Sequence, residues 1–143
     1  MSGQVRPGAG YWIIAVVSLL WNGFGGFDYY MTQTRNPAYL SQFPAEIIQY
    51  IDIMPVWATV AWAIGVWGSV LGSILLLLRS GWAVPVFWIS LLGLAASTCY
   101  QVYVGMPPSM QTPAMLGMMA VIWLALIFQL WFAMRSAAKG YLG

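Results

Sequence analysis

The run IMPVWATVAWAIGVWGSVLGSILLLL, from Ile53 to Leu78, holds 26 residues without a charged side chain, and it decides the class of fold. As a helix with a rise of 1.5 Å per residue it would extend about 39 Å, whereas the hydrocarbon core of a bilayer is about 30 Å thick. Tilt, or a start in the headgroup region, absorbs the surplus length. The run therefore predicts a helix that spans a membrane.

The rest of the chain has the same character. Of its 143 residues 62% are hydrophobic and only 6% are charged, whereas a soluble domain has about 25% charged residues. Three further apolar runs are long enough to span. We therefore expect an all-α integral membrane protein that forms a single domain, 1–143, with four transmembrane helices over approximately 11–32, 53–78, 82–104 and 114–134.

The segment 33–52 is the longest one that we expect outside the membrane. It contains Arg35, Glu46 and Asp52. Pro44, Ala45 and Glu46 resemble the start of a helix, and the apolar residues that follow would let it lie along the headgroups. A solvated connector is the alternative, and the sequence leaves both open.

Basic residues indicate the orientation. Four of them fall on one side of a four-span arrangement, namely Arg6, Arg79, Arg135 and Lys139, and only Arg35 falls on the other. Because cytoplasmic loops carry an excess of Lys and Arg, we expect both termini in the cytoplasm and the 33–52 loop outside it.

Several classes of chemistry have no visible basis in this sequence. The chain lacks histidine, and Cys99 is its only cysteine, so neither an internal disulfide nor a His/Cys metal site can form. No ionisable side chain lies deep within a span, which leaves no acid–base pair for catalysis. We therefore expect no enzymatic activity and no cofactor. A net charge of +2 without clustered Lys or Arg does not indicate a nucleic-acid partner.

Polar and aromatic side chains gather where the predicted spans end on the outer side. The candidate ligand-binding residues are Asn22, Asp28, Tyr30, Trp57, Trp62, Tyr100, Gln101 and Met118. Amides and aromatic faces together suit a neutral ligand such as a sugar, a quinone or a lipid headgroup. In the other interpretation, Asn22 and Gln101 hydrogen-bond across helices and the aromatic residues form an interfacial belt. If the two amides pair or share a ligand, their substitutions should be non-additive.

Small residues in the second span recur at a spacing of four. Ala61, Gly65, Ser69 and Ser73 form one stripe, and Gly68 with Gly72 forms a GxxxG motif on a neighbouring one. Such stripes let helix backbones approach closely. The candidate helix-packing residues are Gly65, Gly68, Ser69 and Gly72. We expect them to pack on the chain's own helices, with a dimer contact as the alternative.

Several short motifs occupy packing and interface positions: Leu19-Leu20-Trp21-Asn22, Trp57-Ala58-Thr59, the leucine run between Gly68 and Arg79, Trp82-Ala83-Val84-Pro85, Trp131-Phe132-Ala133 and Gly140-Tyr141-Leu142. Together they resemble a group of small bacterial four-span proteins that are often labelled "sugar transporter". The resemblance implies a multi-pass protein of the bacterial inner membrane. It transfers no functional residue, since its motifs concern packing.

The predicted function follows from what is absent as much as from what is present. We expect a non-enzymatic accessory or interaction subunit of a larger inner-membrane complex, with the lipid bilayer and other membrane subunits, or a second copy, as partners. That role requires no ionisable group within the spans. The alternative is a protein that binds a sugar-like solute, a lipid or a quinone, or an uncoupled transporter that acts as an oligomer.

Overall fold

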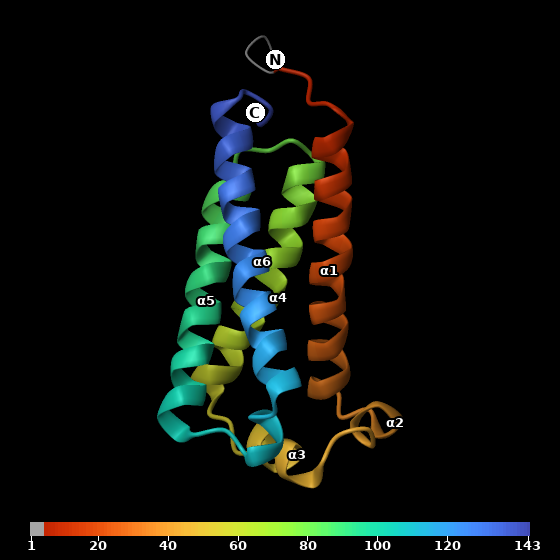
Figure 1. Ribbon diagram of the computed structural model, residues 1–143, viewed down its shortest axis with the longest axis vertical. Coiled ribbons are helices and arrows are strands. Elements are labelled where there is room, and N and C mark those ends of the chain that lie inside the picture. The colour runs from red at the N-terminus through yellow and green to blue at the C-terminus, as the bar shows by residue number, and fades with distance from the viewer. Residues whose placement is uncertain (1–4) are drawn as a thin grey trace.

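The computed structural model describes residues 5–143 and confirms an all-α protein (Figure 1). The four long helices are α1 (Ala9–Gln33), α4 (Val56–Leu77), α5 (Ala83–Val104) and α6 (Pro113–Ala138). Each is long and apolar enough to cross a membrane. The structure thus agrees with a multi-pass membrane protein in contact with the bilayer. The largest difference from the predicted bounds is at the end of α6, which continues past Met134 to Ala138.

Local sequence explains where several helices begin and end. The Thr112 hydroxyl accepts a hydrogen bond from the Met115 backbone N–H at 3.3 Å and caps α6, whose first turn contains Pro113. Gly105 follows α5 with φ of 85°, a conformation that favours glycine. Arg79, in the turn between α4 and α5, also has positive φ, at 54°.

The 33–52 segment contains two short helices, α2 (Pro37–Leu40) and α3 (Ala45–Asp52). In α3, Ile47 and Tyr50 are buried against the protein. The 3-10 helix η1 (Pro108–Met110) follows α5, and there the Glu46 carboxylate accepts a hydrogen bond from the Ser109 backbone N–H at 2.9 Å. The connector is therefore partly helical, and α3 is fastened to the loop that precedes α6.

The half of the bundle that carries the termini is tightly packed. Both chain ends lie at this end of the molecule (Figure 1). Its core consists of Tyr11, Ala15, Leu76, Ala83, Phe87, Leu126, Leu130, Ala133 and Leu142. The Tyr11 hydroxyl donates to the Leu76 carbonyl at 2.5 Å, and the Arg79 guanidinium donates to the carbonyls of Val5 and Tyr141 at 2.6 and 3.0 Å. These bonds join α1, α4 and the residues after α6.

Glycines bring α4 and α5 into close contact. A Cβ added at Gly93 would lie 2.7 Å from the Gly65 backbone nitrogen, and one added at Gly68 would lie 3.0 Å from the Ser90 Cβ. A Cβ added at Gly72 would meet the Phe87 ring at 2.8 Å. The Ser90 hydroxyl donates to the Gly65 carbonyl at 2.6 Å. The glycines of the predicted packing stripes therefore face α5 of the same chain, whereas Ser69 faces α1.

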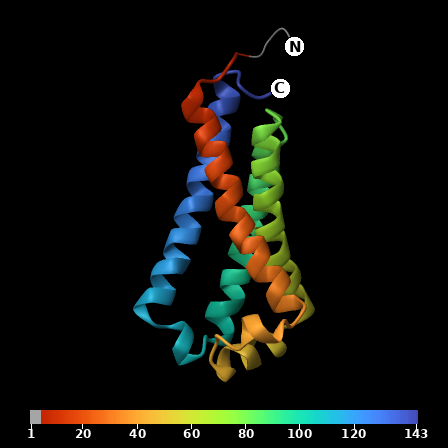
Figure 2. The same cartoon turned by 90° about the vertical axis from the view of Figure 1, so that its right-hand side faces the viewer.

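The other half of the bundle is open. Figure 2 shows α1 and α6 diverging toward the end that carries α2 and α3. Every buried residue of α6 lies at Leu126 or beyond, so its first half contributes none to the core. In contrast, buried residues occur along the whole of α1, from Tyr11 to Thr32. Helix α1 therefore packs along α4 over its whole length, whereas α6 diverges from α1 toward the loop end of the bundle.

The predicted orientation can be tested by labelling single cysteines in a Cys99→Ala background. We expect Thr34→Cys and Gln111→Cys, which are exposed at the loop end, to react in intact cells with a membrane-impermeant maleimide. Lys139→Cys, exposed at the opposite end, should react only after the membrane is permeabilised. Labelling of Lys139→Cys alone in intact cells would reverse the orientation.

Candidate functional site

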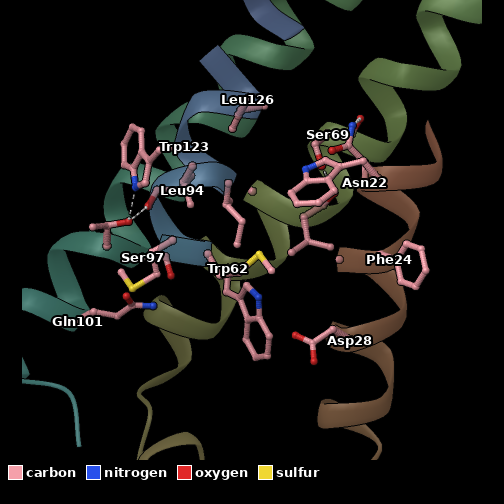
Figure 3. Close-up of a pocket in the computed structure, with 18 residues that line it drawn as sticks. Asn22, Phe24, Asp28, Trp62, Ser69, Leu94, Ser97, Gln101, Trp123 and Leu126 are labelled. Carbon is pink, nitrogen blue, oxygen red and sulfur yellow. Dashed lines mark hydrogen bonds between the residues drawn. The ribbon is translucent and has the colours of Figure 1, made fainter. Parts of the chain in front are cut away.

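A cavity of about 610 Å³ lies in the open half of the bundle (Figure 3). All four long helices contribute to its wall. The lining residues are Trp21, Asn22, Phe24, Gly25 and Asp28 of α1, Trp62, Gly65, Val66 and Ser69 of α4, Leu94, Ser97, Thr98 and Gln101 of α5, and Met118, Met119, Ile122, Trp123 and Leu126 of α6. Most of this wall is apolar or aromatic. Proteins use cavities of roughly 300–1,000 Å³ with such linings for small molecules.

Asn22 forms a buried network at the end of the cavity that adjoins the packed half. Its Nδ2 donates to the Ser73 hydroxyl and to Gln129 Oε1, both at 2.6 Å. Gln129 Nε2 reaches back toward Asn22 Oδ1 at 3.4 Å, and the Ser73 hydroxyl donates to the Ser69 carbonyl at 2.9 Å. All four residues are buried. The network satisfies these polar groups within the bilayer and joins α1, α4 and α6.

Gln101 lies on the opposite side of the cavity, near the end of α5. Figure 3 shows its amide extending from α5 into the space between the helices. Its Oε1 atom is buried and has no hydrogen-bond partner within the described residues. A buried acceptor without a partner costs about 1–3 kcal/mol, so a donor from a bound molecule would remove that cost.

A second polar group on the α5 wall already has its partners. The Thr98 hydroxyl donates to the Leu94 carbonyl at 2.8 Å and accepts from Trp123 Nε1 at 3.2 Å. This indole bond links α5 to α6 across the cavity wall. Both Thr98 and Trp123 are among the residues that line the cavity.

Asp28 is the only charged residue among those that line the cavity in the described part of the chain. Its carboxylate accepts a hydrogen bond from the Tyr39 hydroxyl of α2. Partial burial, together with this hydrogen bond and the negative charge of Asp28, raises the pKa of Tyr39 from 10.0 to about 12. Tyr39 therefore stays protonated at neutral pH and remains the donor to Asp28.

The cavity includes five of the eight predicted ligand-binding residues, namely Asn22, Asp28, Trp62, Gln101 and Met118. The other three, Tyr30, Trp57 and Tyr100, are not among the residues that line the cavity. Tyr30 is 60% exposed. Trp57 and Tyr100 pack edge to face, with ring centroids 5.5 Å apart, and Tyr100 also contacts Tyr50 of α3. Trp57, Tyr100 and Tyr50 therefore form a separate aromatic cluster next to α3.

In the described part of the chain, the two candidate amides, Asn22 and Gln101, are not hydrogen-bonded to each other. The partners of Asn22 are Ser73, Gln129 and the Ser69 carbonyl, and Gln101 is not among them. The sequence could not specify this arrangement, because it depends on the rotation of each helix about its axis. Asn22 therefore hydrogen-bonds across helices, as one of the two interpretations expected. Binding of a ligand by Gln101 remains a prediction.

No family model, curated protein or solved structure matches this chain. The four apolar helices suggest a small four-span membrane protein. Membership of the bacterial group that the packing motifs resemble stays a prediction.

Several residues of the site were not among the predicted ones. Gln129 and Ser73 complete the Asn22 network, and Thr98 with Trp123 forms the α5–α6 bond. Gln129 carried an available signal, since an amide within an apolar span needs an internal partner. Thr98 carried none, because a threonine in a membrane helix can bond to its own backbone.

Proposed function

We propose that this protein binds a neutral, amphipathic small molecule in the cavity and does not transform it chemically. The observation that carries the proposal is the Gln101 side chain on the wall of an otherwise largely apolar space, an amide whose buried Oε1 has no hydrogen-bond partner within the described residues. A ligand with one hydrogen-bond donor and an apolar body would satisfy both features. Apart from the Asp28 carboxylate, which already accepts a hydrogen bond from Tyr39, the hydrogen-bonding groups on the wall are amides, hydroxyls and indoles, which recognise a neutral molecule.

Binding accounts for the geometry better than passage across the membrane does. The cavity ends at the buried Asn22 network, and beyond it the half that carries the termini is filled by the core around Phe87 and Leu76. A solute would have to displace this packing in order to cross. We therefore propose a binding protein of the bacterial inner membrane and place an uncoupled transporter second.

The role of an accessory subunit also stays a proposal, of lower rank. In the sequence it was supported by the absence of an ionisable group deep within the spans, and by the abundant Trp, Met and small residues, which a partner could cover. Helix α5 of the same chain covers Gly65, Gly68 and Gly72. The stripe therefore offers no free surface for a second subunit or a second copy, whereas the cavity offers a site of defined size and chemistry.

Photolabelling of the purified protein in nanodiscs can test binding. Three diazirine probes would be used: a monoacylglycerol, a short-chain benzoquinol and a glucoside without a long alkyl chain. We expect at least one of them to label Ser97 saturably, because this side chain lines the cavity yet is only 9% exposed, beyond the reach of bulk lipid. An excess of the matching unlabelled compound should remove the label.

Two variants of α4 sharpen this test. Val66→Phe places a larger side chain in the cavity wall and should reduce saturable Ser97 labelling at least tenfold. Val60→Phe makes the same change at a position that is 48% exposed and does not line the cavity, so it should retain labelling. Absence of saturable labelling with all three probes in the unmodified protein would refute the proposed function.

A further inference from the structure

The cavity wall is interrupted between α1 and α6. The closely packed helix pairs are α4 with α5, α1 with α4 and α5 with α6, and the pair α1 with α6 is not one of them. In the described part of the chain, the side-chain hydrogen bonds that join these two helices are those of Asn22 with Gln129. From that bond toward the loops, the two helices diverge (Figure 2). The cavity therefore has an opening on this side.

Two of the residues that line the cavity are also exposed to the surroundings, and the ring of one of them, Phe24, extends from α1 away from the cavity (Figure 3). Phe24 lines the cavity and is 76% exposed, and Met118 lines it and is 52% exposed. Counted at 1.5 Å per residue, Phe24 lies about 14 Å before the end of α1, and Met118 about 8 Å after the start of α6. Both positions fall within the apolar parts of their helices. The opening is therefore lateral, toward the hydrocarbon of the bilayer.

The route from the aqueous side is more restricted and more polar. Helix α3 and η1 lie across the loop end of the bundle (Figure 1), held together by the Glu46–Ser109 hydrogen bond. On the same side, Asp28 is engaged by Tyr39. An apolar molecule from the membrane meets no such obstacle at the lateral opening, where Phe24 and Met118 present apolar surface.

On the basis of the proposed function, we infer that the ligand is a membrane lipid with a hydroxyl or amide donor in its head, which enters sideways between α1 and α6. Its chain lies against the apolar residues of α6, and its head donates a hydrogen bond to the Gln101 amide, whose side chain turns the buried Oε1 toward the ligand. This orientation keeps the head near the loop end of the cavity, at the level of the membrane surface, and the chain toward the membrane interior.

Two glycines of α1 that are separated by one residue, Gly23 and Gly25, provide a matched test of the lateral opening. Gly25 lines the cavity, whereas Gly23 does not, and an added Cβ meets nothing within 4 Å at either position. Nanodiscs with the protein would be mixed with vesicles that carry a diazirine monoacylglycerol of 18 carbons, and Ser97 labelling followed over time. We expect Gly25→Trp to slow labelling at least tenfold and Gly23→Trp to leave it unchanged.

A change at Gln101 tests recognition of the head. Gln101→Met removes the unpartnered acceptor with little change in shape, so the thermal midpoint in detergent should stay the same or rise. The concentration of the monoacylglycerol at half-maximal Ser97 labelling should increase about 3- to 10-fold. Unchanged labelling by this variant would refute the hydrogen bond to Gln101.

A water-soluble probe separates failure of this inference from failure of the proposed function. Diazirine monobutyrin has the same glycerol head with a chain too short to reside in the bilayer. Labelling of Ser97 by monobutyrin but not by the long-chain lipid would overturn lateral entry of a lipid and leave the binding site intact. Labelling by neither, together with failure of the quinol and the glucoside, would overturn both the inference and the proposed function.

Discussion

Replacement of Gly93 by alanine is expected to lower the free energy of unfolding by about 3 kcal/mol or more. The new methyl group would lie 2.7 Å from the Gly65 nitrogen and 2.8 Å from the Ala61 carbonyl oxygen. Both are backbone atoms of a regular helix and cannot yield as a flexible side chain would. Relief of the clash requires α4 and α5 to move apart, which weakens the closest helix contact in the bundle. Unfolding in mixed micelles with increasing SDS would measure the loss.

Gly23→Ala is the matched control for this change. It also replaces a glycine within a membrane-spanning helix, but an added Cβ meets nothing within 4 Å. We expect the free energy of unfolding to stay the same or to rise by up to about 1 kcal/mol, because alanine favours a helix more than glycine does. Equal losses at Gly23 and Gly93 would show that contact between α4 and α5 is not the cause.

Asn22→Leu is expected to cost about 2–3 kcal/mol of stability. Hydrogen bonds between membrane helices contribute about 0.6 kcal/mol on average and up to about 2 kcal/mol. The substitution also leaves Gln129 buried without its amide partner, at a cost of about 1–3 kcal/mol. The same unfolding titration would measure this effect. A variant as stable as the unmodified protein would contradict the hydrogen-bonded network.

A double-mutant cycle identifies the partner of Asn22. With Gln129→Leu as the second substitution, the combined loss should be at least 1 kcal/mol smaller than the sum of the two single losses, because neither change then strands an amide. With Gln101→Leu as the second substitution, the two effects should add within about 0.5 kcal/mol. Additive losses with Gln129→Leu together with non-additive losses with Gln101→Leu would instead indicate that Asn22 pairs with Gln101.

The four helices could be predicted because the bilayer imposes a length and a composition that a single sequence reveals. Ile53 to Leu78 predicts a span by its lack of charge, and the structure places α4 at Val56–Leu77. The turn at Arg79 and Ser80 and the prolines after Gly105 mark the breaks between helices. These signals are local, so they need no knowledge of which helices are neighbours.

The details of the site depend on the rotation of each helix about its axis, which the sequence determines only weakly. Most faces of these spans are apolar, since one side contacts lipid and the other side the protein core. Trp57 and Trp62 are both aromatic residues of the same span, yet only Trp62 lines the cavity. Gln129 was visible as an amide in an apolar run, but its proximity to Asn22 required the packing of α1, α4 and α6.

Helix α6 is packed firmly in its second half, from Leu126 onward, and much less in its first half. Its last turns belong to the core of the packed half, and the contact of Gln129 with Asn22 is the point about which the rest of the helix would tilt. The part of α6 from its start at Pro113 to Gln129 is about 24 Å long. A tilt of about 5° around this contact would move the start of the helix by about 2 Å, so a small angular change near the two amides is amplified where the Thr98–Trp123 and Glu46–Ser109 bonds hold this part of the chain.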